Sequence, residues 1–162
     1  MEELVAGLPE KLNQAEPILG YTDKDTVKLD FDDITFKNVK YWAIRAINWF
    51  KLQGCLILKS SENCYHVIFD RKVSWKHNMH IVAWVCLQSK NQGLLKWFIM
   101  QCIKESSTVR LSPKGDKPTP RIVYHHGKQT GEIQNYLQYR SLVKKIRDLN
   151  KSSRANRGDI DE

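Results

Sequence analysis

Hydrophobic residues change their spacing several times along this chain, and these changes restrict its fold more than any other feature. Val27, Leu29 and Phe31 alternate with charged residues, which is the period of a half-buried strand. Residues 38–52 instead carry apolar side chains at helical spacing, and Gly54 is the predicted stop. The chain therefore combines strands and helices.

The same two periods recur over the rest of the chain. Two short apolar runs, 55–59 and 64–70, are separated by four polar residues and predict a hairpin. The further predicted elements are two helices within 78–104, strands around 107–111 and 120–124, and a final helix over about 132–149. The order β-α-β-β-α-α-β-β-α predicts an α+β fold, with a largely antiparallel sheet of RNA-recognition-motif type and helices packed on one face. Such a fold leaves the opposite sheet face free for ligands.

One domain accounts for the length of 162 residues. We expect it to cover residues 21–150, between an irregular lead-in at 1–20 and a disordered basic tail at 151–162. No apolar run is long enough to predict a membrane span, and the first twenty residues lack the apolar core of a signal peptide. The four cysteines lie in separate apolar runs without a CxxC pair, so we interpret them as reduced core residues of a cytoplasmic, intracellular protein.

The balance of charge favours an anionic partner. Lysine and arginine number 26 against 18 aspartate and glutamate residues, which gives a formal net charge of +8. Basic residues gather in the predicted last helix, where they either track a nucleic-acid backbone or form an ordinary solvated face. The candidates for nucleic-acid binding are Arg140, Lys144, Lys145 and Arg147.

Strand alternation brings several charged side chains to the predicted free face. When the apolar residues of the first strand face the helices, Asp30 and Asp32 face away from them. The same alternation turns His66 of the hairpin and Arg110 of the following strand outward. Two carboxylates, a histidine and an arginine are thus predicted on one surface.

Asp30 and Asp32 form an Asp-x-Asp pair whose Cα atoms are expected about 7 Å apart on one strand face. Two carboxylates at this spacing can share a hard divalent cation such as Mg²⁺ or Mn²⁺. Two such ions can clamp the attacking and leaving oxygens of a phosphoryl transfer. The alternative is that both carboxylates only solvate an edge strand, since Asp-x-Asp pairs are common.

Three segments together resemble the archaeo-eukaryotic primase superfamily, which includes the catalytic primase subunit and the primase-polymerases of plasmids, viruses and mobile elements. The segments are VKLDFDD, SSENCYHVIFD and TVRLSPKGDK, and they follow the family's order within residues 26–124. The first resembles the family's Asp-x-Asp strand. The second resembles its serine, short turn and histidine, and the third its arginine followed by a basic loop.

The resemblance implies a role for each matching residue. Asp30 and Asp32 would bind the catalytic Mg²⁺ or Mn²⁺ ions, and His66 would complete the catalytic set beside them. The nucleotide-binding residues that it implies are Ser61, His66, Arg110, Lys114 and Lys117.

The chain departs from the family at the third metal carboxylate, which is usually an aspartate on the strand shortly before the arginine. In the segment 101–107 only Glu105 is acidic, and it is a weak candidate for the third ligand. Asp70 and Asp116 are other conceivable donors, although neither lies at the expected position. Losing one ligand weakens a two-metal site.

These residues are compatible with two functions. The first is a DNA primase/polymerase-like nucleotidyltransferase that uses nucleoside triphosphates on a single-stranded DNA template in replication. The second is a non-catalytic, single-stranded nucleic-acid-binding replication module that keeps the primase fold. A helicase or accessory primase subunit is a conceivable partner of either. A rolling-circle nuclease agrees less well with the sequence, because no predicted strand carries His-x-His.

Overall fold

The structure is a computed structural model that describes residues 17–158. In chain order the elements are β1 (Gly20–Asp23), β2 (Thr26–Phe31), α3 (Phe36–Phe50), β3 (Gly54–Ser61), β4 (Cys64–Lys72), α4 (Trp75–Ser89), α5 (Gln92–Lys104), β5 (Ser107–Arg110), β6 (Arg121–Gly127) and α6 (Glu132–Gly158). Each predicted helix and strand overlaps one of these elements, and β1 is additional.

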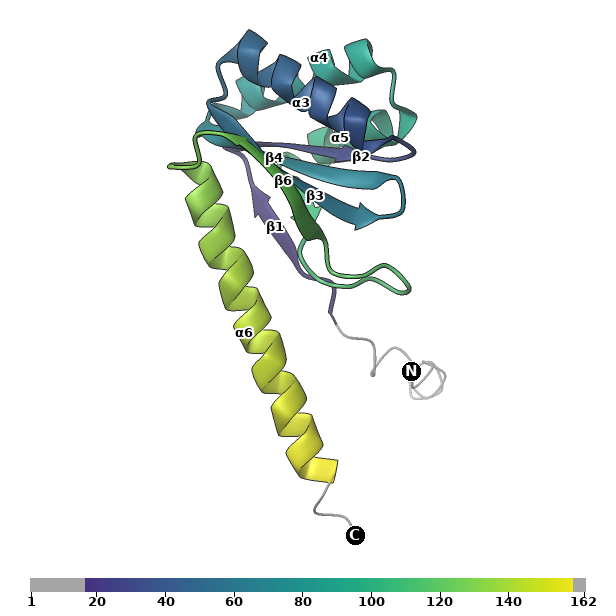
Figure 1. The fold of residues 1–162 in the computed structure, drawn as a ribbon, viewed down its shortest axis with the longest axis vertical. Coiled ribbons are helices and arrows are strands. Elements are labelled where there is room, and N and C mark those ends of the chain that lie inside the picture. Colours follow the sequence, from purple (N-terminus) through teal and green to yellow (C-terminus); the bar gives the residue numbers. More distant parts are fainter. Residues whose placement is uncertain (1–16, 159–162) are drawn as a thin grey trace, which may run out of the picture.

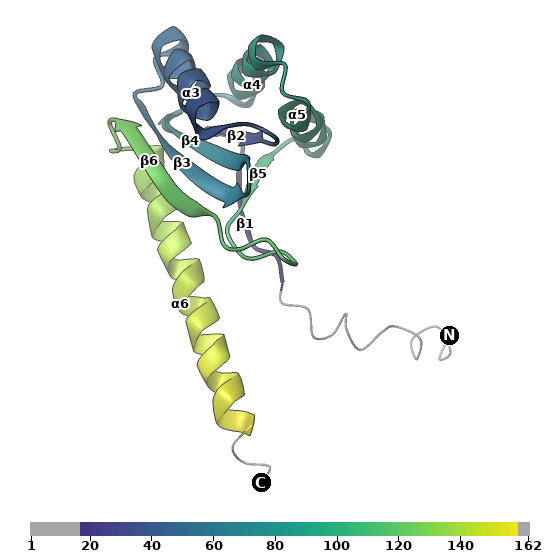
Figure 2. The ribbon, with the colours of Figure 1, turned by 45° about the vertical axis from the view of Figure 1, so that its right-hand side comes forward.

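Four strands form the main sheet, in the order β2-β4-β3-β6, and every neighbouring pair is antiparallel. The remaining strands, β1 and β5, form a separate antiparallel ribbon. Helices α3, α4 and α5 cover one face of the main sheet (Figure 1), and Figure 2 shows the same layering from a second direction. The predicted α+β class with an antiparallel sheet is therefore confirmed.

The face of the sheet beneath α3, α4 and α5 holds the larger apolar core. Val27, Leu29 and Phe31 of β2 are fully buried there, as are Val67 and Phe69 of β4. The alternation read from the sequence is thus correct for both strands, because the residues between these positions point to the other face.

The opposite face of the sheet is not free, and this part of the prediction is wrong. Leu56, Leu58 and Ile68 pack there in a second buried cluster. The side chains that cover them come from β5, from the residue that follows it and from α6, namely Val109, Leu111, Ile133, Tyr136 and Val143. The physical reason is that β3 and β4 are apolar at successive positions, so that both of their faces require burial.

Helix α6 is anchored at its first turn and then extends past the sheet (Figure 1). The Asp70 carboxylate at the end of β4 accepts hydrogen bonds from the backbone N–H groups of Thr130, Gly131 and Ile133, at 2.7, 2.8 and 3.1 Å. This carboxylate satisfies N–H groups that a helix start leaves unpaired and complements the helix dipole. Asp70 is therefore a capping residue of α6.

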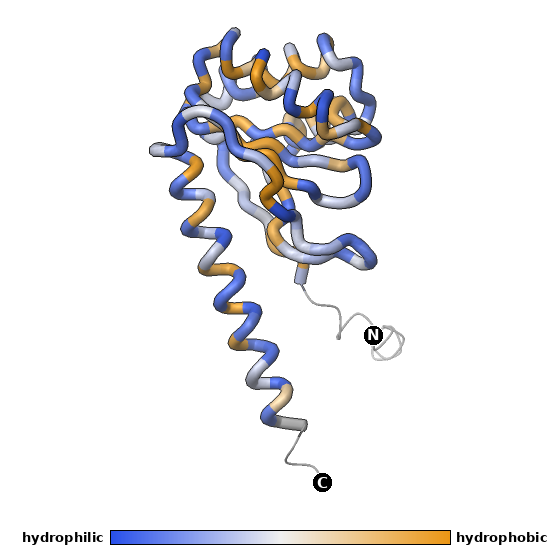
Figure 3. The backbone as a smooth tube through the Cα atoms, in the orientation of Figure 1, coloured by the Kyte–Doolittle hydropathy of each residue, from blue (hydrophilic) through white to orange (hydrophobic). Residues whose placement is uncertain are grey.

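The helix continues to Gly158, so that residues 151–158 are helical instead of forming the predicted disordered tail. Its apolar residues Leu142, Ile146 and Leu149 are 53%, 47% and 67% exposed. Figure 3 shows apolar positions continuing along the projecting part of the helix. The predicted lead-in, except for residues 17–20, and the last four residues of the predicted tail lie outside the described residues.

The end of α3 differs from the prediction. The helix stops at Phe50, and Lys51 adopts the left-handed conformation with φ 55°. Gly54 is instead the first residue of β3. A Cβ atom at Gly54 would collide with the carbonyl oxygen of Lys128, so the glycine permits the close approach of β3 to the chain after β6.

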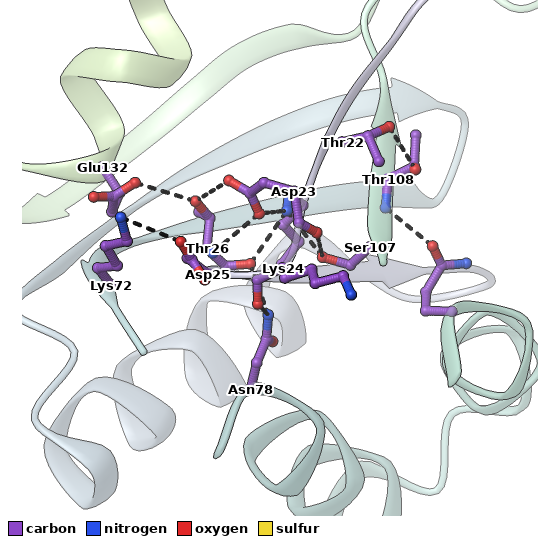
Figure 4. Close-up of polar contacts among 12 residues, drawn as sticks. Thr22, Asp23, Lys24, Asp25, Thr26, Lys72, Asn78, Ser107, Thr108 and Glu132 are labelled. Carbon is purple, nitrogen blue, oxygen red and sulfur yellow. Dashed lines mark hydrogen bonds and ion pairs between the residues drawn. The ribbon is translucent and has the colours of Figure 1, made fainter. Parts of the chain in front are cut away.

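A polar network joins the turn between β1 and β2 to the surrounding elements (Figure 4). Lys28 is completely buried, and its Nζ donates to Asp23 Oδ1 at 2.6 Å and to Ser107 Oγ at 2.9 Å. The Nδ2 atom of Asn78 on α4 donates to the carbonyl oxygen of Lys24 at 2.9 Å. Lys28 thus points away from α3, α4 and α5, as alternation requires, but lies beneath the β1–β5 ribbon.

No helix within residues 17–158 combines the length and apolar character needed to cross a membrane. The cysteines are free thiols, as expected. Cys55 and Cys86 are buried, whereas Cys102 is exposed, so the interpretation of all four cysteines as core residues is wrong at Cys102.

Candidate functional site

Asp30 and His66 are direct partners in the antiparallel pairing of β2 with β4. The distance from His66 Nε2 to Asp30 Oδ1 is 3.6 Å. The His66 side chain is only 5% exposed, while 28% of the Asp30 side chain reaches solvent. The alternation of two strands therefore places a buried imidazole beside a carboxylate at the edge of the covered sheet face.

Burial shifts both groups toward their neutral forms. The pKa of Asp30 is raised to about 7, first by burial and then by the charge of Asp32, while Lys117, Arg110 and Lys114 oppose the rise. The pKa of His66 is lowered to about 3 by burial and by the positive charges of Arg110 and Lys117. Near pH 7 the imidazole is therefore neutral, and the Asp30–His66 contact is not an ion pair.

Arg110 at the end of β5 fastens the loop that follows it. Its Nη1 donates to the carbonyl oxygens of Ser112 and Pro118, the second at 2.7 Å. Its Nη2 donates to the carbonyl oxygen of Ser60 at 3.0 Å. The guanidinium thus joins the loop to the β3–β4 hairpin and holds a positive charge near Asp30 and His66.

Lys114 and Lys117 face each other at the tip of this loop, which we call the 111–120 loop. Two backbone hydrogen bonds join them, at 3.0 and 2.9 Å. Both lysines are exposed, as is Asp116 between them. Their charges act on Asp30, because both oppose the rise in its pKa.

A hollow of about 290 Å³ opens above Asp30, and we call it the Asp30 hollow. Its polar lining consists of Asp30, Gln101, Lys104, Thr108, Arg110 and Lys114. Lys104 Nζ donates to Thr108 Oγ1 at 2.8 Å. Three cationic side chains and one carboxylate of raised pKa make this hollow better suited to an anion than to a metal cation.

Asp32 lies beyond the end of β2, is exposed and lines a different hollow, between the starts of α3 and α5. Its carbonyl oxygen accepts from Asn91 Nδ2 at 2.6 Å. Gly93 is required beside it, because a Cβ atom there would collide with the Asp32 side chain. Asp32 is close enough to raise the pKa of Asp30, but the two carboxylates line separate hollows.

The described residues do not fit a two-metal site. Within 17–158, no group of three or more His, Cys, Asp or Glu side chains is arranged to hold a metal ion. The residue two positions before Arg110 is Thr108, which is bonded to Lys104. Glu105 is exposed at the end of α5 and is not among the residues that line the Asp30 hollow. Asp70, the other conceivable donor on the sheet, caps α6.

Ser60, the residue before the predicted Ser61, is the serine whose carbonyl oxygen Arg110 contacts. Ser60 is only 4% exposed. Ser61 ends β3 and pairs with Cys64 at the hairpin turn. A register shift between Lys59 and Ser61 interrupts the alternation there, so the period of the strand could not identify which serine faces Arg110.

The predicted basic residues of α6 divide into two sets. Arg140, Lys144 and Arg147 line a groove of about 660 Å³ between α6 and the segment leading into β6. Lys145 is exposed but is not among the residues that line this groove. Arg121 and Lys151 line it as well, and no sequence motif had singled out Arg121.

The chain was compared with protein-family models, curated proteins and solved structures. None of them matches.

Proposed function

We propose that this chain is a non-catalytic replication module of the primase type, which binds a nucleotide through its phosphates and also binds single-stranded nucleic acid. The observation that carries the proposal is the pairing of Asp30 with His66 beneath Arg110 and the 111–120 loop. The same residue types, in the same order along the chain, form the segments that resemble primases. A sheet of RNA-recognition-motif type is part of this proposal. The adjacent strands β2, β4 and β3 with helices on one face support it, and β6 extends the sheet beside β3.

Phosphate binding follows from the charges around the Asp30 hollow. Lys104, Arg110 and Lys114 line it, and Lys117 is joined to Lys114 by backbone hydrogen bonds. Ammonium and guanidinium groups make charge-assisted hydrogen bonds with phosphate oxygens, which are about twice as strong as neutral ones. Below its raised pKa, the Asp30 carboxyl is protonated, so that it does not repel an anionic ligand.

The absence of catalysis is proposed because the Asp30 hollow presents one carboxylate. A two-metal phosphoryl transfer needs several oxygen ligands that converge on both ions. Thr108 and Lys104 also line this hollow, and a hydrogen bond joins them. A threonine hydroxyl brings no negative charge to a cation site, and an ammonium group has no lone pair with which to bind a cation.

A second candidate is a metal-dependent DNA primase/polymerase, which one observation favours. The charge of Asp32 raises the pKa of Asp30, so the two carboxylates interact despite lining different hollows. A Mg²⁺- or Mn²⁺-bound state would require the Asp32 side chain to turn away from Gly93 and toward Asp30. Single-stranded DNA template, nucleoside triphosphates and a helicase or accessory primase subunit are the partners in this case.

Titration calorimetry with a nucleoside triphosphate, with and without Mn²⁺, tests the proposal on the full chain. Lys114→Ala/Lys117→Ala is expected to weaken triphosphate binding at least about tenfold, since two charge-assisted contacts are lost. Lys37→Ala/Lys76→Ala is the matched control, because both lysines are exposed on α3 and α4 across the sheet. Equal weakening in both variants, or no triphosphate binding by the wild type, would contradict the proposal.

Primer extension on single-stranded DNA with Mn²⁺ separates the two candidates. The module is expected to bind triphosphate and single strands without making product. Extension by the wild type that disappears in Asp30→Ala/Asp32→Ala would establish the enzyme instead. A polymerase that contaminates the preparation would continue to extend the primer in the presence of the double variant.

A further inference from the structure

The groove beside α6 is the largest concave surface of strongly basic character described above. It runs between α6 and the residues 119–121 that lead into β6. Five basic side chains line it, against the single carboxylate of Asp148: Arg121, Arg140, Lys144, Arg147 and Lys151. A concave wall of one charge raises the local concentration of an oppositely charged ligand.

The basic residues of α6 that line this groove follow the period of the helix. Arg140, Lys144, Arg147 and Lys151 recur at intervals of four, three and four residues, which places them on one face. Eleven residues of helix correspond to about 16 Å along the axis. Lys145 is one residue out of phase, and its side chain therefore leaves the helix about 100° away from that of Lys144.

Apolar side chains line the groove together with the basic ones. Leu111, Pro120, Leu137 and Val143 line it between the basic side chains. A double helix keeps its bases stacked inside, so that the base faces cannot contact such side chains. A single strand can instead place its phosphates on the lysines and its unstacked bases against arginine guanidinium planes and the apolar side chains.

We infer that this groove is the track of a single nucleic-acid strand, with Lys144 and Lys151 on its phosphates and Arg121 on the opposite wall. This inference rests on the proposed function and states where the strand lies. The 111–120 loop borders the track, because Leu111 and Pro120 line the groove, and Lys114 of the same loop lines the Asp30 hollow. A strand in the groove would thus lie beside the loop that separates it from the hollow.

A charge-matched pair of variants tests the track. Lys144→Glu and Lys145→Glu change the same helix by the same charge at neighbouring exposed positions. Binding of a fluorescein-labelled oligothymidylate is followed by anisotropy over a range of salt concentrations. Lys144→Glu is expected to weaken binding at least about tenfold and to reduce the slope of log K against log salt by about 0.7 or more. Lys145→Glu is expected to weaken it less than about threefold.

The outcomes distinguish failure of the track from failure of the proposed function. Equal weakening by both variants would show general attraction to a basic helix and overturn the track. Unchanged binding in Lys144→Glu, Lys151→Glu and Arg121→Glu would place the strand elsewhere and also overturn it, with the function intact. A wild type that binds triphosphate but no oligothymidylate would overturn both the track and the single-strand part of the function. Displacement of the strand by polyglutamate of equal charge would show that the groove selects only charge, which contradicts a nucleic-acid track.

Discussion

His66 and Asp30 face each other across the β2–β4 pairing, and burial moves their pKa values in opposite directions, to about 3 and about 7. Both groups therefore favour their neutral forms in the folded protein. Neither is stabilised by the 3.6 Å contact in the way that an ion pair would be. Two buried ionisable groups that do not form an ion pair contribute no electrostatic stabilisation to the fold. Buried polar residues of this kind are typical of functional sites.

Asp30→Asn is expected to stabilise the protein more at pH 8 than at pH 5. The unfolded carboxyl has a pKa of about 3.9, against about 7 in the folded chain, so the folded wild type binds the extra proton between these values. Its stability at this site therefore falls as pH rises from about 4 to 7. Asparagine removes this loss, which we expect to be about 2 kcal/mol after allowing for the partial exposure of Asp30.

Urea unfolding of both proteins at the two pH values measures this difference. The lowered pKa of His66 makes stability rise with pH below about pH 6.5, which is the opposite direction. Both proteins contain His66, so this contribution to stability cancels in the comparison. Asp116→Asn removes a carboxylate from the exposed loop tip and serves as the control for net charge. A gain in stability from Asp30→Asn that is the same at pH 5 and pH 8 would disprove the raised pKa.

Arg110→Lys is expected to destabilise the protein by about 1–3 kcal/mol, although the charge is kept. Lysine cannot reproduce the planar guanidinium that reaches three carbonyl oxygens, on Ser60, Ser112 and Pro118. Limited proteolysis should cut the 111–120 loop faster in this variant. Arg45→Lys, which loses one exposed hydrogen bond to Tyr41 and keeps a cation near the Tyr41 and Trp42 rings, is expected to cost much less. Similar losses in both variants would mean that Arg110 does not hold the loop.

Asp70→Ala is expected to destabilise the protein by about 2 kcal/mol and to reduce its helical signal in circular dichroism. The carboxylate accepts from three N–H groups at the start of α6, so its removal leaves them without these bonds. Asp70→Asn should recover part of the loss, because an amide oxygen still accepts. Asp25→Ala breaks only the exposed ion pair with Lys72 and should cost less than about 1 kcal/mol. If Asp25→Ala proved as costly as Asp70→Ala, the capping role would be refuted.

Thr108→Asp/Lys104→Met is expected to create Mn²⁺ affinity in the Asp30 hollow. The two changes add a second carboxylate beside Asp30 and remove a cation that now bonds Thr108. Calorimetric titration should show Mn²⁺ binding at least about tenfold tighter than in the wild type. Thr119→Asp/Lys104→Met has the same charge but places the acid beside the groove. Equal Mn²⁺ affinity in the two variants, or tight binding by the wild type, would contradict this description of the hollow.

The strands and helices were predictable wherever one face of an element is apolar. Val27, Leu29 and Phe31 give a clear period of two, and their burial follows it. The strand β1 carries only one large apolar residue, Tyr21. It is held by its pairing with β5, which no local sequence pattern predicts. The successive apolar residues of β3 indicate that both faces of this strand are buried. A search for simple alternation of apolar and polar residues does not detect such a strand.

The candidate site was predictable where regular periods hold. Asp30, His66 and Arg110 are brought together as strand alternation and chain order required. Asp32 was misplaced because β2 ends at Phe31, and the period of a strand says nothing about the next residue. The period of a helix does place Lys144 and Lys145 on different sides of α6. The opposite wall of the groove, to which Arg121 of β6 belongs, depends on tertiary packing.

The 111–120 loop is a wall shared by two compartments, and this has a consequence for how their occupants communicate. Arg110 fixes the loop from the side of the Asp30 hollow, while Leu111 and Pro120 form part of the groove. Any ligand that displaces the loop from one side reshapes the other. For the nucleotide and the single strand of the proposed function, thermodynamic reciprocity requires that any change which one ligand makes in the affinity of the other is matched by the same factor in return. The chain would thus sense whether both ligands are present, without needing a catalytic step.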